Sequence, residues 1–258
     1  MERSEPARPV AAWRFLIPNL FTAASACLGL SAILLAMMGS PVWASWCVLW
    51  CVLLDKLDGT AARLLGSTSL FGMQFDSFAD LIAFGLAPAV LVFSAGRQVW
   101  ALAEGSLAWW LWALGCGLYA LMATIRLARF NADCDGAPLR TFCGVPSTLC
   151  GAIVPAALLV ALEYRIDFEL ARYFPALMVV LGLGMVSRVP VPKVVRRRNR
   201  AFDAFQWINV VAAYVCGILM LLPEYLLGLG VFYLVVGAGH GLLRGAARPA
   251  TGTPSAER

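Results

Sequence analysis

The sequence predicts an all-α, polytopic integral membrane protein with about eight transmembrane helices. Of its 258 residues, 61% are apolar and only 14% are charged, and the mean hydropathy is +0.78. Soluble domains carry roughly 25% charged residues, so this chain has too little polar surface to cover a water-facing exterior. The charges that it does have are separated by long uncharged runs, which fixes where the helices are expected.

The uncharged runs define the helices in chain order. Forty uncharged residues separate Arg14 from Asp55, with the turn-like Gly39-Ser40-Pro41 inside them, which is enough for two crossings of about 20 residues each. Six further runs occur at 81–96, 105–125, 141–162, 173–187, 204–223 and 225–243. The predicted helices therefore span about 16–38, 43–66, 72–95, 106–130, 145–163, 172–189, 205–222 and 225–243.

The distribution of basic residues predicts the orientation. If eight spans alternate, 17 of the 20 basic residues fall on one side, and only Arg97, Arg165 and Arg172 fall on the other. Because basic loops are retained in the cytoplasm, both termini are predicted to be cytoplasmic. The expected organisation is a cytoplasmic segment at 1–15, one transmembrane domain at 16–244 and a disordered cytoplasmic tail at 245–258.

The placement of the basic residues also argues against nucleic acid as a partner. These residues lie at the ends of predicted spans rather than on one folded surface. The densest run, at 193–200, is interpreted as a cytoplasmic anchor that attracts anionic lipid; binding of an anionic lipid substrate is the alternative.

Four carboxylates stand out at the predicted cytoplasmic boundary of the membrane. Asp55 and Asp58 are three residues apart near the end of the second helix, and Asp76 and Asp80 are four apart near the start of the third. Each pair therefore lies on one helical face. A short turn around Gly66-Ser67 is expected to join the two helices as an antiparallel hairpin, so all four side chains can converge on one small volume.

Such a cluster requires neutralisation. A charged side chain at the centre of a membrane helix costs about 3 kcal/mol on insertion scales, and Lys56 is expected to point away from the Asp55/Asp58 face. Two divalent cations would balance four carboxylates, and all-oxygen ligation suits Mg²⁺ or Mn²⁺. A metal pair about 4 Å apart supports in-line displacement at phosphorus. Charge alone equally permits a cation-coupled transporter, whose water-filled pathway such residues would line.

The spacing of the segment at 55–80 decides between these interpretations. It fits D-x2-D-G-x2-A-R-x8-G-x3-D-x3-D at every fixed position, namely Asp55, Asp58, Gly59, Ala62, Arg63, Gly72, Asp76 and Asp80. In this pattern the chain resembles the CDP-alcohol phosphotransferase family. The resemblance implies a transmembrane enzyme that cleaves a CDP-linked substrate at its diphosphate, transfers a phosphoryl-bearing group to a hydroxyl and releases CMP. It also implies a two-metal site and a homodimer.

The resemblance assigns roles to individual residues. It makes Asp55, Asp58, Asp76 and Asp80 the metal ligands and Asp80 also the general base, because a carboxylate can take the proton of an attacking hydroxyl. It places the nucleotide and diphosphate beside a second group of residues, Gly59, Ala62, Arg63 and Gly72. Asn19 is added as a possible phosphate donor, with capping of the first helix as the alternative.

Further segments are similar to the phosphatidylserine synthase branch of the family. They are Ile17-Pro18-Asn19-Leu20, Asp76 to Asp80 running into Phe84 to Ala89, Arg126 to Asn131, and Gly144-Val145-Pro146-Ser147. The expected substrates are then CDP-diacylglycerol and L-serine, with phosphatidylserine and CMP as products. The alternatives for the acceptor are glycerol 3-phosphate, an inositol compound or choline.

The end of the fourth predicted helix offers candidates for binding the acceptor. Arg126 and Arg129 could pair with the carboxylate of serine, and Asn131 follows them. The alternative is that both arginines are ordinary anchors that extend to the lipid headgroups.

Overall fold

The computed structural model describes residues 13–66, 69–133, 142–187, 190–191 and 200–246. The N-terminal segment up to residue 12, Ser67, the basic run at 193–199 and the tail from 247 lie outside the described residues. The helices are α1 (Trp13–Met37), α2 (Pro41–Leu65), α3 (Leu70–Asp80), the π-helix η1 (Leu81–Leu86), α4 (Ala87–Gln98), α5 (Leu107–Asp133), α6 (Ser147–Glu163), α7 (Phe168–Ala171), α8 (Phe174–Val186), α9 (Arg200–Leu219) and α10 (Pro223–Ala246).

Each of the eight predicted helices has a counterpart, with three differences. The helix predicted at 72–95 consists of α3, η1 and α4, and the one predicted at 172–189 is α8, which ends at Val186 and follows the short α7. The described chain is also not purely helical. Two short strands, β1 (Phe142–Cys143) and β2 (Pro190–Val191), pair antiparallel, with Phe142 opposite Val191.

The π-helix follows directly after Asp80 and has a local cause. A regular α-helix would bond the carbonyl of Phe84 to the N–H of residue 88, but residue 88 is proline and has none. The hydroxyl of Tyr119 on α5 donates to this carbonyl instead, at 2.8 Å. Inside η1, the N–H of Ala87 bonds to the carbonyl of Ile82, five residues earlier. One extra residue is thereby accommodated between the carboxylates of α3 and the packed face of α4.

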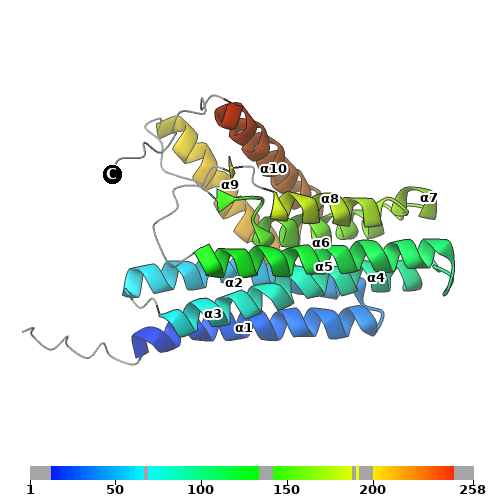
Figure 1. Cartoon of the computed structure of the whole chain (residues 1–258), viewed down its shortest axis with the longest axis horizontal. Coiled ribbons are helices and arrows are strands. Elements are labelled where there is room, and N and C mark those ends of the chain that lie inside the picture. The colour runs from blue at the N-terminus through cyan, green and yellow to red at the C-terminus, as the bar shows by residue number, and fades with distance from the viewer. Residues whose placement is uncertain (1–12, 67–68, 134–141, 188–189, 192–199, 247–258) are drawn as a thin grey trace, which may run out of the picture.

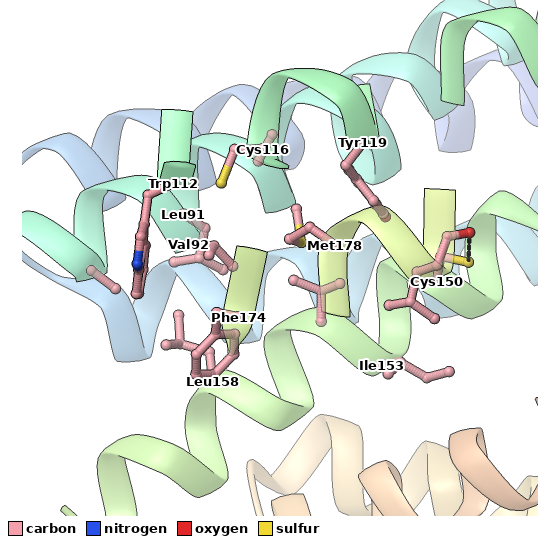
Figure 2. Close-up of a cluster of buried hydrophobic side chains, with 14 of the residues drawn as sticks. Leu91, Val92, Trp112, Cys116, Tyr119, Cys150, Ile153, Leu158, Phe174 and Met178 are labelled. Atoms are coloured by element: carbon pink, nitrogen blue, oxygen red, sulfur yellow. Dashed lines mark hydrogen bonds between the residues drawn. The ribbon is translucent and has the colours of Figure 1, made fainter. Parts of the chain in front are cut away.

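Figure 1 shows α1 to α6 and α8 running roughly alongside one another, with α9 and α10 slanting across one side of this bundle. Helix α1 packs against α2, α3 and α4, while α5 packs against α8, and α6 packs against α2 and α10. Buried side chains from α4, α5, α6 and α8 form the largest apolar core (Figure 2), which includes Leu91, Trp112, Ile153 and Met178.

Four described segments are long and apolar enough to cross a membrane, judged by length and composition. They are Phe15–Met37, Leu70–Gln98, Leu107–Ala132 and Phe168–Val186. Three shorter apolar helices cover Ser147–Glu163, Trp207–Leu219 and Pro223–Gly237. Large apolar side chains such as Leu20, Val180 and Phe232 are exposed on these helices, as expected for surfaces that face lipid. The number of eight crossings stays a prediction.

Candidate active site

Three of the four predicted carboxylates come together. One oxygen from each of Asp55, Asp76 and Asp80 lies within 4.8 Å of the other two, and all three residues are partly buried. Helix α1 packs against both α2 and α3, whereas α2 and α3 have few close backbone approaches to each other. The predicted hairpin is therefore held together largely through α1, and the carboxylates meet between two helices whose backbones stay apart.

Asp58 lies beside this group and contacts α1. It is 6% exposed, and its Oδ2 is 3.3 Å from the hydroxyl of Thr22. That hydroxyl is also 3.1 Å from the carbonyl oxygen of Pro18, so its single proton can serve either acceptor. Asp58 interacts electrostatically with Asp76 and Asp55, although it is not part of the mutually close set of oxygens.

Two cations oppose part of the negative charge. The Nζ of Lys56 lies 3.6 Å from Oδ2 of Asp55, so the expectation that Lys56 points away is wrong; its long side chain reaches back to the adjacent residue. That side chain is 63% exposed, and an exposed ion pair contributes little. Arg126, on α5, interacts electrostatically with Asp80 and Asp55.

The donor set fits a hard divalent cation. Four carboxylates outnumber the two cations that oppose them, and carboxylate oxygens are the ligands that Mg²⁺ and Mn²⁺ prefer. The separation of up to 4.8 Å among oxygens of Asp55, Asp76 and Asp80 is compatible with their sharing an ion of this kind. The geometry thus supports a site for a divalent metal ion.

The residues predicted to lie beside the nucleotide lie on α2, α1 and α3. Gly59 lies beside the guanidinium of Arg63: a methyl group added there would contact Nη1 at 3.5 Å and Nη2 at 3.9 Å. Arg63 is exposed, and its Nη2 donates to the hydroxyl of Thr60, one turn earlier, at 3.3 Å. Ala62 is half-buried, and its carbonyl accepts the N–H of Gly66 at the end of α2.

Asn19 and Gly72 lie where α1 meets the start of α3. A Cβ added to Gly72 would be 3.3 Å from Oδ1 of Asn19 and 3.1 Å from the hydroxyl of Ser69. Ser69 caps α3, because its hydroxyl accepts the N–H of Gly72 at 3.0 Å. The absence of a side chain at Gly72 therefore allows the close approach of α1 to α3.

The three candidate acceptor-binding residues of α5 differ in their surroundings. Arg126 donates from Nη1 to the hydroxyl of Ser147 at 2.8 Å. Arg129 donates from Nη1 to the carbonyl of Val186, at the end of α8, at 2.9 Å. Both contacts are with the protein rather than the lipid headgroups considered as the alternative. The four carboxylates Asp55, Asp58, Asp76 and Asp80 are called the acidic centre below. Of the two arginines, Arg126 is the one whose positive charge interacts with this centre, at Asp80 and Asp55.

Asn131 connects α5 with α3. Its Oδ1 accepts a hydrogen bond from the hydroxyl of Ser77 at 2.9 Å, and its Nδ2 donates to Oε1 of Gln74 at 3.3 Å. Ser77 adjoins Asp76 in the sequence, so Asn131 ties the end of α5 to the helix that carries two of the carboxylates.

Sequence reasoning missed Thr22, Ser77 and the partner of Arg126. Thr22 could have been found, because it lies three residues after Asn19 on the same face of an apolar helix. Ser77 and Ser147 lie in segments that carry the family resemblance, but nothing local predicted their contacts, because their partners Asn131 and Arg126 are 54 and 21 residues away in the chain.

The fold and the carboxylate cluster define a helical membrane protein with a polar site whose ligand atoms fit divalent cations. A model of the CDP-alcohol phosphatidyltransferase family matches residues 15–186. The chain is similar to a protein named CDP-diacylglycerol–serine O-phosphatidyltransferase from Helicobacter pylori, with 36% identity over 184 residues that cover 69% of this chain and 72% of the relative.

Two further relatives come from other organisms. One from Mycobacterium leprae with the same name is 31% identical and is covered over 58% of its length, against 69% of this chain. A protein named archaetidylserine synthase, from Methanothermobacter thermautotrophicus, is 32% identical, with 69% of this chain and 70% of the relative covered.

The chain belongs to the CDP-alcohol phosphatidyltransferase family. It is therefore an integral membrane enzyme, a transferase of phospholipid biosynthesis, and the interpretation as a cation-coupled transporter is wrong. The aspartates, glycines and arginine of the pattern at 55–80 all fall inside the matched residues.

Proposed function

We propose that this enzyme transfers a phosphatidyl group from CDP-diacylglycerol to the hydroxyl of L-serine, giving phosphatidylserine and CMP. The observation that carries the proposal is the convergence of Asp55, Asp76 and Asp80 within 4.8 Å in a chain of this family. The choice of serine is supported by the names of its relatives, which include synthases of phosphatidylserine and archaetidylserine. The active site and both termini face the cytoplasm in this proposal, and a homodimer is expected.

The chain's own residues account for each part of the reaction. Asp55, Asp58, Asp76 and Asp80 would hold two Mg²⁺ or Mn²⁺ ions, which when bound supply charge stabilisation for the phosphates. The hydroxyl oxygen of serine forms a bond to phosphorus, the diphosphate bond breaks, and CMP leaves. Asp80 accepts the proton of the hydroxyl as that bond forms. Without this acceptor, a neutral hydroxyl is a poor nucleophile.

The remaining site residues bind and orient the substrates. The side of α2 at Gly59, where the guanidinium of Arg63 lies, takes the diphosphate, whose oxygens suit a guanidinium partner. Ala62, Gly72 and Asn19 complete this side of the site. Arg126 binds the carboxylate of serine, while Arg129 and Asn131 hold the end of α5 in place through their contacts with α8 and α3.

The proposal is tested with purified enzyme in detergent, CDP-diacylglycerol, Mn²⁺ or Mg²⁺, and a panel of alcohols: L-serine, glycerol 3-phosphate, myo-inositol, myo-inositol 1-phosphate and choline. CMP release is measured for each. We expect release that depends on L-serine. Release that depends on a different alcohol would overturn the choice of acceptor, and no release with any alcohol would overturn the reaction.

A further inference from the structure

The motif Gly144-Val145-Pro146-Ser147 has a defined place between β1 and α6. Gly144 has a φ of +86°, and a Cβ there would collide with the carbonyl oxygens of Met185 and Ser187 at the end of α8. The N–H of Val145 donates to the carbonyl of Gly184 at 3.0 Å. The motif is thus docked against the end of α8, and this docking determines where α6 begins.

The first residue of α6, Ser147, is 2% exposed. Its hydroxyl oxygen accepts the hydrogen bond from Nη1 of Arg126. The Nε of Arg126 is buried and has no hydrogen-bond partner among the described residues. A buried N–H without a partner is costly, so a ligand that accepted a hydrogen bond from this group would gain affinity.

The contact with Ser147 leaves one edge of the guanidinium available. When Nη1 is engaged, Nε and Nη2 on the other edge still present two parallel N–H groups, the arrangement that binds a carboxylate through both of its oxygens. The positive charge of Arg126 acts on Asp80, the proposed general base, and on Asp55. A carboxylate on this edge would bring the rest of the acceptor near the acidic centre.

We propose that Ser147 is a positioning residue, which holds Nη1 of Arg126 so that the Nε and Nη2 edge binds the carboxylate of an amino-acid acceptor. The proposal rests on the proposed function. It gives the motif at 144–147 a role in acceptor specificity: docking on α8 fixes Ser147, Ser147 orients Arg126, and Arg126 selects acceptors that carry a carboxylate.

The test compares two acceptors that differ only at the carboxylate. L-serine carries it, and L-serinamide replaces it with a neutral amide. Ser147→Ala is expected to lower kcat/KM for L-serine about tenfold through a higher KM, the size of effect expected for one hydrogen bond to a charged group. The same variant should leave kcat/KM for L-serinamide and the KM for CDP-diacylglycerol unchanged. A fall of equal size for both acceptors would overturn the proposal.

Three further variants separate a loss of Arg126 positioning from a general loss of structure or activity. Ser147→Thr keeps a hydroxyl and should retain the preference for L-serine. Ser45→Ala is the matched control: Ser45 is also buried, its hydroxyl donates to the carbonyl of Pro41 at the start of α2, and it precedes Asp55 by ten residues. It should leave both acceptors unaffected. Arg126→Lys keeps the charge without the two-pronged edge and should lose the same preference.

The outcomes are distinguishable from failure of the proposed function. If the wild-type enzyme uses L-serine and Ser147→Ala keeps its full preference over L-serinamide, the positioning role is wrong and the function stands. If Ser147→Ala does not fold, Arg126→Lys decides, because unchanged discrimination in that variant would overturn the inference. If the wild-type enzyme uses only alcohols without a carboxylate, both the function and the inference are wrong.

Discussion

The acidic centre and the apolar core at α4, α5, α6 and α8 differ in the interactions that dominate them: charge in the centre and close packing in the core. The core is held by shape: Trp112, Phe174 and Met178 are buried in one apolar cluster (Figure 2). A Cβ on Gly96 would lie 2.5 Å from the ring of Trp112. In the centre, like-charged groups converge from α2 and α3, whose backbones approach each other closely at few points. Changes of volume should therefore harm the first region, and changes of charge the second.

The largest effect is expected at the proposed general base. Asp80→Asn removes the proton acceptor with almost no change of volume, so turnover should fall by about 10²- to 10⁴-fold, while binding of CDP-diacylglycerol is largely retained. Steady-state CMP release and equilibrium binding of the lipid measure the two effects. Asp167→Asn is the control, since Asp167 is an exposed residue before α7 without a side-chain capping bond. Near-normal turnover in Asp80→Asn would exclude Asp80 as the base.

Asp58 tests the metal-binding part of the centre. Asp58→Ala should raise the Mn²⁺ concentration needed for half-maximal activity about tenfold or more, because loss of a ligand weakens the site. The melting temperature should change little or rise, since removing one of several repelling carboxylates relieves strain in the protein without metal. If the metal dependence is the same as in the wild type, Asp58 is not a ligand.

The core should respond in the opposite way. Trp112→Ala leaves a large cavity beside Gly96 and should cost about 3 kcal/mol or more of stability, seen as a lower melting temperature in detergent. The enzyme that remains folded should have an unchanged metal requirement, because the substitution leaves all four carboxylates in place. A changed metal requirement with an unchanged melting temperature would contradict the distinction between the two regions.

Tyr119 lies where the two regions meet, and a smaller effect is expected there. Tyr119→Phe keeps the ring in the core but leaves the carbonyl of Phe84 in η1 without its hydroxyl donor, at a cost of about 1–3 kcal/mol. Because η1 starts directly after Asp80, turnover should fall along with stability. A loss of stability with full turnover per folded molecule would show that η1 does not orient Asp80.

Thr22 should give the smallest effect. Thr22→Val keeps the shape of a buried side chain and removes the hydroxyl beside Asp58, so the Mn²⁺ requirement should rise only a few-fold, by the loss of one hydrogen bond to a charged group. Thr22→Ser should restore the wild-type requirement. A requirement that Thr22→Ser fails to restore would assign the effect to packing rather than to the hydroxyl.

Much of the fold and of the centre could be predicted because the signals are local. Uncharged runs predict where helices lie, and spacings of three and four residues place Asp55 with Asp58 and Asp76 with Asp80 on single faces. The interruption at 81–86 was missed although Pro88 is visible in the sequence, because apolar residues continue through it and a helix can accommodate proline in several ways.

What could not be predicted depends on contacts between distant segments. The pairing of Phe142 with Val191, the bond from Tyr119 to Phe84 and the bond from Arg126 to Ser147 join residues whose separation follows no helical period. Lys56 was misplaced for a different reason: face assignment treats a side chain as a direction, whereas a flexible lysine can reach its neighbour.

The most direct test of the acidic centre is a Mn²⁺ titration of metal-stripped enzyme, with bound Mn²⁺ followed by electron paramagnetic resonance and CMP release measured on the same samples. We expect turnover to be absent after stripping and to rise in proportion to bound Mn²⁺. The variant Asp55→Asn/Asp76→Asn should bind none in the same concentration range. Full turnover after exhaustive chelation, or undiminished Mn²⁺ binding by that variant, would contradict the account.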